Sequence, residues 1–232
     1  MKISKRYNIV ALLIITAFFV TSCTTMLPKP SPNMTDDERN AAKDQCIAMN
    51  TVGGAVLGGV VGGLLGGRDG AVKGAIAGGT TAFALAWGKC IAYYFNVANT
   101  QVADYKETAK SINYEPKKGT LVKLETLKAS PSTLAPGKQI TLIGKYYVLD
   151  PETTKDLSVT ESFYIVYYDK EGNANKLNEP INQKRTIDPG TRKIEGPIDL
   201  PKELPEGRYK IIYEVSYKNQ TDRREVEVSV KN

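Results

Sequence analysis

The chain has 232 residues, with 31 Lys and Arg against 25 Asp and Glu, three cysteines and no histidine. Without histidine it cannot build a Ser-His-Asp or Cys-His catalytic centre, or a histidine-ligated zinc or haem site. The net charge of +6 does not predict nucleic-acid binding, because basic and acidic residues are interleaved along the chain.

Residues 1–22 predict a lipoprotein signal peptide. Two lysines and an arginine near the N-terminus precede an apolar run over residues 9–20, which ends at Val20-Thr21-Ser22-Cys23. That ending resembles the lipobox of bacterial lipoproteins. The resemblance implies that Cys23 becomes the mature N-terminus and carries lipid of the palmitate type. It also implies that Thr24 favours sorting to the outer membrane in enteric-type bacteria. An uncleaved N-terminal anchor helix is the alternative.

Residues 23–34 predict an extended tether, because the stretch contains three prolines and no apolar periodicity. Thr35-Asp36-Asp37-Glu38 then has the pattern of a capping box, with Thr35 as the N-cap and Glu38 reaching back to it. We expect a helix to begin here and to continue into the apolar tract that follows.

That tract carries glycine at every fourth position, which leaves a bare groove along one helix face for a second helix backbone. In water it would be a poor helix, since each interior Gly costs about 0.8–1 kcal/mol relative to Ala. A break at Gly66-Gly67-Arg68-Asp69-Gly70 predicts a helix-to-helix turn, and therefore a helical hairpin over residues 35–112. The helix-packing glycines are Gly54, Gly58, Gly62, Gly66, Gly70, Gly74 and Gly78.

Two cysteines test this hairpin. Cys46 and Cys90 lie 22 residues before and after Arg68, so an antiparallel hairpin would bring them level. In an exported chain such a pair predicts a disulfide bond, although two unrelated buried thiols are the alternative.

A cluster of aromatic residues lies at the same level of the predicted hairpin as the two cysteines. It suits a membrane–water interface, or alternatively an aromatic cluster that packs on the next domain. Its members are Trp87, Tyr93, Tyr94 and Phe95.

The lipobox and the glycine repeats over residues 52–66 and 70–79 resemble the glycine-zipper lipoproteins of bacterial outer membranes, including the rickettsial 17-kDa surface antigen type. The resemblance implies contact with membrane lipid and self-association through the glycine faces. It covers about a third of the chain. This chain differs from the group in its paired cysteines and its long C-terminal extension. The role of an individual member therefore cannot be transferred to it.

From residue 117 the apolar residues alternate, which predicts strands separated by Pro-Gly and Asn-rich turns. Short strands over residues 117–232 predict an all-β Ig-like sandwich. The expected strands are Thr120–Lys128, Gln139–Leu149, Glu161–Tyr168, Lys184–Ile187, Ile194–Leu200, Arg208–Tyr217 and Arg223–Val230.

Three kinds of residue in this half are candidates for function. Tyrosines such as Tyr147, Tyr164 and Tyr168 could form a protein- or glycan-binding face, or pack as half-buried strand residues. Carboxylates at turns, namely Asp150 with Glu152 and Glu203 with Glu206, are weak candidates for acid–base chemistry. The loop Asp169, Glu171 and Asn173 lacks the full spacing of a calcium loop. We therefore expect no catalytic residue, no metal and no cofactor.

The expected fold class is α+β multidomain, with a glycine-zipper helical hairpin followed by an all-β Ig-like sandwich. The expected function is that of a non-enzymatic envelope lipoprotein, lipid-anchored at the outer membrane on its periplasmic side. It would be held also by the hairpin, and would present the Ig-like module to an unknown envelope protein or glycan. An oligomeric pore or channel component is the alternative, although the hairpin has few polar residues to line a lumen.

Overall fold

The computed structural model describes residues 29–30, 34–50, 83–152, 155–169 and 172–231. The chain divides into two compact units, Met1–Ala82 and Phe83–Asn232. The signal peptide, Cys23 and the seven helix-packing glycines lie outside the described residues, so their predicted roles stay predictions.

In the first unit, residues 36–50 are helical. The capping box that starts this helix is confirmed. The Thr35 amide donates to Glu38 Oε2 at 2.9 Å, and the Glu38 amide donates to Thr35 Oγ1 at 3.2 Å. The hydrogen bonds from Thr35 lower the pKa of the Glu38 carboxyl. Reciprocal bonds of this kind satisfy amide groups that a helix N-terminus otherwise leaves unpaired.

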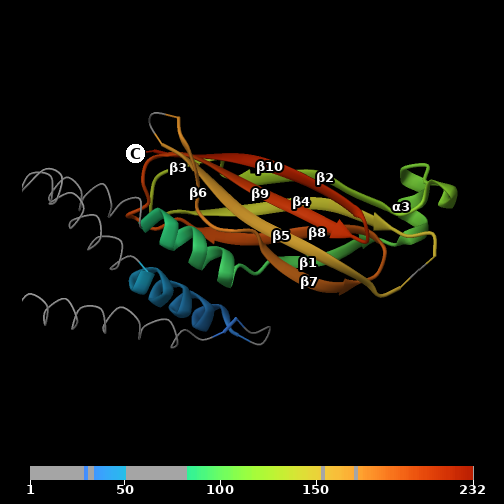
Figure 1. The fold of residues 1–232 in the computed structure, drawn as a ribbon, viewed down its shortest axis with the longest axis horizontal. Helices are drawn as coiled ribbons and strands as arrows, with labels where there is room; N and C mark the ends of the chain where they lie inside the picture. Colours follow the sequence, from blue (N-terminus) through green and yellow to red (C-terminus); the bar gives the residue numbers. More distant parts are fainter. Residues whose placement is uncertain (1–28, 31–33, 51–82, 153–154, 170–171, 232) are drawn as a thin grey trace, which may run out of the picture. The chain divides into compact units, whose positions relative to one another are not determined.

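The second unit is mostly β (Figure 1). Its described residues also form a helix over residues 83–94, helix α3 (Tyr105–Ser111) and a short 3-10 turn (Pro116–Lys118). The strands are β1 (Ala98–Ala103), β2 (Leu121–Ser130), β3 (Thr133–Leu134), β4 (Gln139–Leu149), β5 (Leu157–Tyr168), β6 (Ala174–Lys176), β7 (Ile181–Ile187), β8 (Gly190–Asp199), β9 (Gly207–Tyr217) and β10 (Gln220–Val230).

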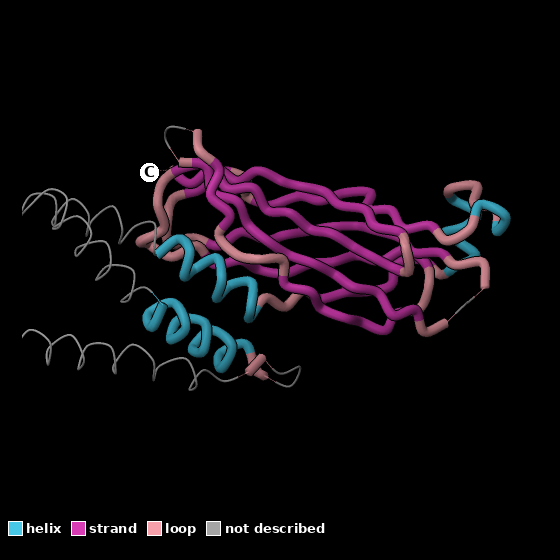
Figure 2. Tube along the Cα trace, viewed as in Figure 1, coloured by secondary structure: helices cyan, strands magenta, loops and turns pink. Residues whose placement is uncertain are grey.

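These strands form two sheets in a β-sandwich-like arrangement. The first sheet has the order β1-β8-β4-β2, and the second has β3-β10-β9-β5-β6 with β7 also paired to β5. Figure 2 shows the strands of both sheets running lengthwise through the unit. Alternate residues are buried, among them Leu142 and Ile194 of the first sheet and Ile165 and Ile211 of the second. This period of two places one face of each sheet in the core.

The helix over residues 83–94 packs against the strands of the same unit. Trp87 is 1% exposed, and its ring meets Tyr209 edge-on with 6.0 Å between centroids. Phe95 stacks on Phe163 with 4.1 Å between centroids. Trp87 and Phe95 are therefore core residues, as in the alternative of an aromatic cluster packed on the β structure.

The expected fold class is wrong. We expected a separate α+β architecture, with a helical hairpin reaching residue 112 before an Ig-like domain. Instead residues 83–94 pack on the sheets, and residues 98–103 form β1, which pairs with β8. The predicted seven-strand immunoglobulin arrangement is replaced by two sheets that include β1, β3 and β6. Within the described part of the chain, no helix combines the length and the apolar character needed to cross a bilayer.

Close backbone packing explains how β1 joins the first sheet. The chain passes over Gly196 of β8 just before β1 begins, and a Cβ at Gly196 would lie 2.9 Å from the carbonyl oxygen of Asn96. Such a distance is below ordinary van der Waals contact, so any larger residue at Gly196 would force this crossing apart. Beyond it, Ala98 pairs with Glu195 and Thr100 with Lys193.

Candidate functional site

The two described site cysteines form the predicted disulfide: Cys46 and Cys90 are bonded to each other. Both side chains are buried, at 3% and 0% exposure. The alternative of two unrelated thiols is therefore excluded. A disulfide of this kind is typical of chains that mature in an oxidising compartment.

The outward face of the second sheet carries a patch of tyrosines and cations, which we call the tyrosine surface. It consists of Tyr164, Val166 and Tyr168 of β5, Lys176 of β6, and Arg208 and Lys210 of β9. These residues meet because Val166 pairs with both Lys176 and Lys210, while Tyr168 pairs with Arg208. Directly opposed side chains on one face of an antiparallel pair lie within contact distance.

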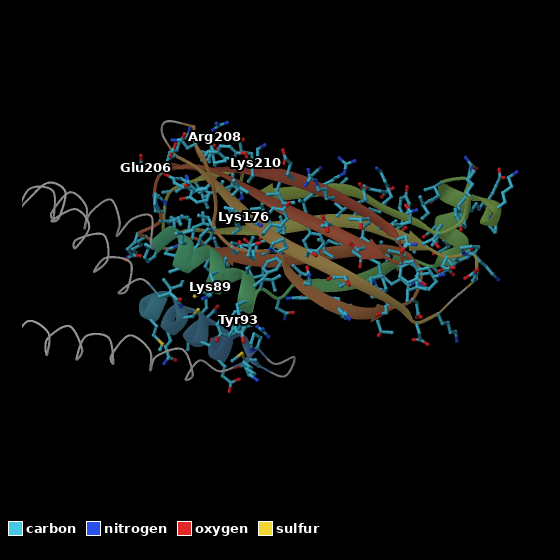
Figure 3. All side chains as sticks on the ribbon, viewed as in Figure 1. Lys89, Tyr93, Lys176, Glu206, Arg208 and Lys210 are labelled. Atoms are coloured by element: carbon cyan, nitrogen blue, oxygen red, sulfur yellow. The ribbon has the colours of Figure 1, made fainter. Side chains whose placement is uncertain are left out.

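Cations lie over the tyrosine rings of this surface. The Arg208 guanidinium and the Lys210 ammonium are 5.3 and 5.5 Å from the Tyr168 ring centroid. The Lys176 ammonium is 5.7 Å from the Tyr164 centroid. Figure 3 shows Lys176, Arg208 and Lys210 at one end of the sheet. Cation–π contacts at exposed sites contribute about 0.5–1 kcal/mol each.

Each cation of the tyrosine surface also has a carboxylate partner. Lys176 Nζ lies 2.7 Å from Glu179, Lys210 Nζ lies 2.8 Å from Glu225, and Arg208 lies 3.6 Å from Glu227. The hydrogen bond that Lys210 donates to Glu225 raises the pKa of Lys210. The surface therefore combines flat aromatic rings with paired charges and has no strong excess of either sign. Tyr and Arg are residue types enriched at protein interfaces.

The three candidate tyrosines do not share one face. Tyr164 and Tyr168 lie on the outward face of the second sheet, where the alternation with Phe163 and Ile165 predicted them. Tyr147 belongs to β4, in the first sheet. Burial removes several other tyrosines from any binding face, including Tyr146, Tyr209 and Tyr213, which are at most 2% exposed. Sequence reasoning missed the three cations, because β6 and the cross-strand register that bring them together were not predicted.

A buried carboxylate joins the two sheets inside the sandwich. Glu161 of β5 is 2% exposed, and its Oε2 accepts a hydrogen bond from Arg185 Nε at 2.6 Å. Its Oε1 accepts from Tyr146 Oη at 2.8 Å and from Asn99 Nδ2 at 2.5 Å, both in the first sheet. Arg192 Nε in turn donates to Asn99 Oδ1 at 2.5 Å. Both carboxylate oxygens are thus engaged, which suits a structural role better than acid–base chemistry.

Two tyrosines beside Glu161 are strongly affected by their surroundings. Burial, followed by the Glu161 charge, raises the pKa of Tyr146 and of Tyr213 well above the ordinary tyrosine value. The Tyr213 hydroxyl is buried and makes no hydrogen bond to any described residue. Both phenols therefore stay neutral at physiological pH, and neither is prepared to act as a nucleophile or base.

Strand β7 also holds the segment between the helix and β1. Gln183 Nε2 donates to the carbonyl oxygen of Phe95 at 2.8 Å, and Arg185 Nη2 donates to that of Val97 at 3.2 Å. These bonds satisfy backbone acceptors of a segment that belongs to neither a helix nor a strand. They connect the helix over residues 83–94 to the second sheet.

The turn carboxylates are mostly engaged. Asp150 is 0% exposed, lies 2.7 Å from Lys218 Nζ and accepts from Tyr217 Oη at 2.8 Å. Asp169 accepts from the amide of Asn173 at 2.7 Å and from its side-chain nitrogen at 3.0 Å, which is a turn rather than a cation site. Glu171 lies outside the described residues. Among the residues that the structure does describe, no group of three or more metal-ligating side chains occurs.

No model of a protein family matches the chain, and no curated protein is significantly similar to it in sequence. One similar solved structure is a family 123 glycoside hydrolase from Clostridium perfringens, with 12% identity and a TM-score of 0.33 over 49% of this chain and 27% of the hydrolase. An alkylpurine DNA glycosylase from Pseudomonas fluorescens has 11% identity and a TM-score of 0.37 over 86% of this chain and 49% of its own.

The CARDB domain of a Pyrococcus furiosus protein has 17% identity and a TM-score of 0.34 over 49% of this chain and 90% of its own. This chain thus spans half or less of the length of the hydrolase and of the glycosylase. At TM-scores this low, none of these likenesses bears on the activity of the chain.

Proposed function

We propose that the protein is a non-enzymatic envelope lipoprotein, anchored by lipid on Cys23, which presents its β-sandwich to another envelope component. The observation that carries this proposal is the sequence Val20-Thr21-Ser22-Cys23 after a charged and then apolar N-terminal segment. A second point of attachment would strengthen the anchoring that lipid provides. The glycines from Gly54 to Gly78 are the proposed site of that attachment, through self-association.

Chemical features of the chain agree with a non-catalytic role in an oxidising compartment. The Cys46–Cys90 disulfide favours the periplasmic side of an outer membrane over the cytosol. The sequence has no histidine to serve as a general base. The buried carboxylates of Asp150 and Glu161 are held by cations and hydroxyl groups.

We assign the tyrosine surface to an envelope protein as partner. Tyr168 with Arg208 presents the side-chain types that dominate binding energy at protein interfaces, where rigid rings bury large area at little entropic cost. The paired charges around them would form a polar rim, which aids specificity and adds little affinity. A glycan partner is the competing outcome, and the second experiment below distinguishes the two.

Lipidation is tested with Cys23→Ala in the native host. We expect this variant to accumulate as an unprocessed precursor without lipid, seen by intact mass and by metabolic labelling with a fatty acid. Ser22→Ala keeps a small residue before the cysteine and should mature normally, so it is the matched control. Normal processing and labelling of Cys23→Ala would refute the lipoprotein assignment.

The partner is tested with a photo-reactive phenylalanine at Val166 in the full chain, expressed in the native host. We expect irradiation to give an adduct of defined mass that yields peptides of a second protein on digestion. The same group at Thr141, in the first sheet, should give none. Tyr164→Ala with Tyr168→Ala should abolish the adduct. An adduct whose added mass is removed by glycosidases would instead identify a glycan, and equal adducts from both positions would exclude a specific surface.

A further inference from the structure

A groove lies between helix α3 and the outward face of the first sheet, at the end of the unit that α3 occupies in Figure 1. Its volume is about 790 Å³, and its walls come from β1, α3, β4 and β8. This volume is in the range of about 300–1,000 Å³ that small-molecule sites occupy. The groove uses none of the residues of the tyrosine surface.

Helix α3 is fixed over the sheet by its own contacts. The hydroxyls of Thr108 and Thr191 share a hydrogen bond of 2.8 Å, and both side chains are buried. A capping box joins Asp104 and Glu107 at the helix start, through bonds of 2.8 and 3.2 Å. These contacts make the groove a preformed feature, because α3 cannot shift without breaking them.

Two lysines from different elements line the groove. Lys110 is in the last turn of α3 and makes no ion pair with any residue described in the structure. Lys145 of β4 lies on the opposite wall and is 2.9 Å from Glu125. Directly beside Lys145 in the sheet register is a further lysine, Lys193 of β8. Lys193 lies 2.5 Å from Glu195, so both of these strand lysines have a carboxylate partner, whereas Lys110 has none among the described residues.

The remaining lining groups suit a sugar. The Ser111 hydroxyl donates its proton to the Thr108 carbonyl at 2.8 Å, so its oxygen faces the groove as an acceptor only. The Glu107 carboxylate, whose Oε2 accepts from the Asp104 amide, adds acceptor capacity at its other oxygen. Val102, which is 50% exposed, and Ala103 supply an apolar wall. Two lysines, the acceptors of Ser111 and Glu107 and a small apolar wall match a ring that carries a carboxylate, several hydroxyls and an apolar face.

We propose that this groove binds an acidic sugar unit of a glycan, with Lys110 and Lys145 holding its anionic group. The acceptors of Ser111 and Glu107 receive its hydroxyl protons, and Val102 contacts its apolar face. This site is independent of the lipid anchor and of the protein partner assigned to the tyrosine surface. Either of those assignments can fail without affecting it.

The test is calorimetric titration of the full chain with a galacturonic acid trisaccharide, and with neutral galactotriose as the matched sugar. We expect binding of the acidic sugar to be at least about tenfold tighter than that of the neutral sugar, and to weaken as salt is added. Lys110→Gln with Lys145→Gln should remove the preference. Lys106→Gln removes a cation from the same helix outside the groove and should leave binding unchanged.

Three results would overturn the proposal. These are absence of binding at millimolar sugar, equal binding of both sugars, and an equal loss of binding with Lys106→Gln. Inorganic phosphate is titrated in parallel. If phosphate binds in a Lys110-dependent way while the acidic sugar does not, the groove is a simple anion site and the sugar assignment is wrong. Circular dichroism of each variant verifies that the β structure is retained.

Discussion

Trp87 Nε1 donates a hydrogen bond to the carbonyl oxygen of Asp199, across 3.0 Å and 112 residues of sequence. The bond attaches the helix over residues 83–94 to the end of β8, and the indole ring also meets Tyr209 of β9. One side chain thus contacts both sheets. The helix that we expected to belong to a separate membrane hairpin is part of the sandwich core.

Replacement of Trp87 should therefore destabilise the β unit. We expect Trp87→Ala to lower the free energy of unfolding by about 3–5 kcal/mol, and Trp87→Phe by less, because it loses mainly the hydrogen bond. Leu85, on the same helix, is 41% exposed, and Leu85→Ala should change stability by about 0.5 kcal/mol or less. Urea unfolding followed by β-sheet circular dichroism measures all three. Equal stability of Trp87→Ala and wild type would contradict the packing described.

The unit should lose stability in acid through Asp150. Burial tends to raise the pKa of this carboxyl, but hydrogen bonds from Lys218, the Glu152 amide and Tyr217, with the Lys218 charge, together lower it. A carboxyl whose folded pKa is lowered stabilises the fold above its unfolded pKa of about 3.9, and the contribution disappears as pH falls through the folded pKa.

Asp150→Asn should therefore flatten the acid limb of a stability–pH profile. At pH 7 it should cost about 1–3 kcal/mol, because the donors of Lys218 and Tyr217 lose their charged acceptor. Glu152, whose side chain is 79% exposed, is the control, and Glu152→Gln should change stability by about 1 kcal/mol at most. An unchanged acid limb in Asp150→Asn would show that other carboxyls dominate the pH dependence.

The buried Glu161 and the partly exposed Arg185 should behave as a coupled unit. Glu161→Leu leaves Arg185 without its carboxylate, and we expect a loss of about 3–5 kcal/mol. Adding Arg185→Met should recover part of that loss, so a double-mutant cycle should give a coupling energy of about 0.5–3 kcal/mol. Chemical denaturation of the four proteins provides the cycle. Strict additivity would mean that the 2.6 Å contact contributes no coupling in solution.

Cys46 and Cys90 should not react with a maleimide in freshly denatured, unreduced protein, and should react after reduction. Their replacement by serine should lower stability by about 3–4 kcal/mol, on the model that a disulfide restricts the unfolded chain. Labelling is followed by intact mass, with reduced protein as the positive control. Modification of both thiols before reduction would contradict the disulfide.

The alternating pattern predicted strands at the seven places where long, half-buried strands occur, from β2 to β10. It missed β1, β3 and β6. The segment Ala98–Ala103 has no alternation of apolar residues, and four of its six residues are exposed while the other two are half-buried. An edge strand of this kind forms because the neighbouring strand supplies hydrogen-bond partners, and a local sequence pattern contains no information about that neighbour.

For the candidate site, the sequence could place Tyr164 and Tyr168 on the outward face of one strand. It could not place Lys176, Arg208 and Lys210 beside them, because register across strands depends on turns and bulges elsewhere. The groove under α3 also could not be predicted from the sequence. It depends on Thr108 meeting Thr191, 83 positions away.

By itself the sequence determined what local chemistry can record: the lipobox pattern, the Thr35 capping box, the alternation of the long strands and the cysteine pairing. Only the tertiary structure decided that Trp87 and Phe95 belong to a β core. Moving apolar and aromatic side chains out of water is favourable in any dry environment, so a lipid boundary and a protein interior stabilise the same side chains. The choice between them is made by the shape and hydrogen bonds of distant partners, here the Asp199 carbonyl and the Tyr209 and Phe163 rings.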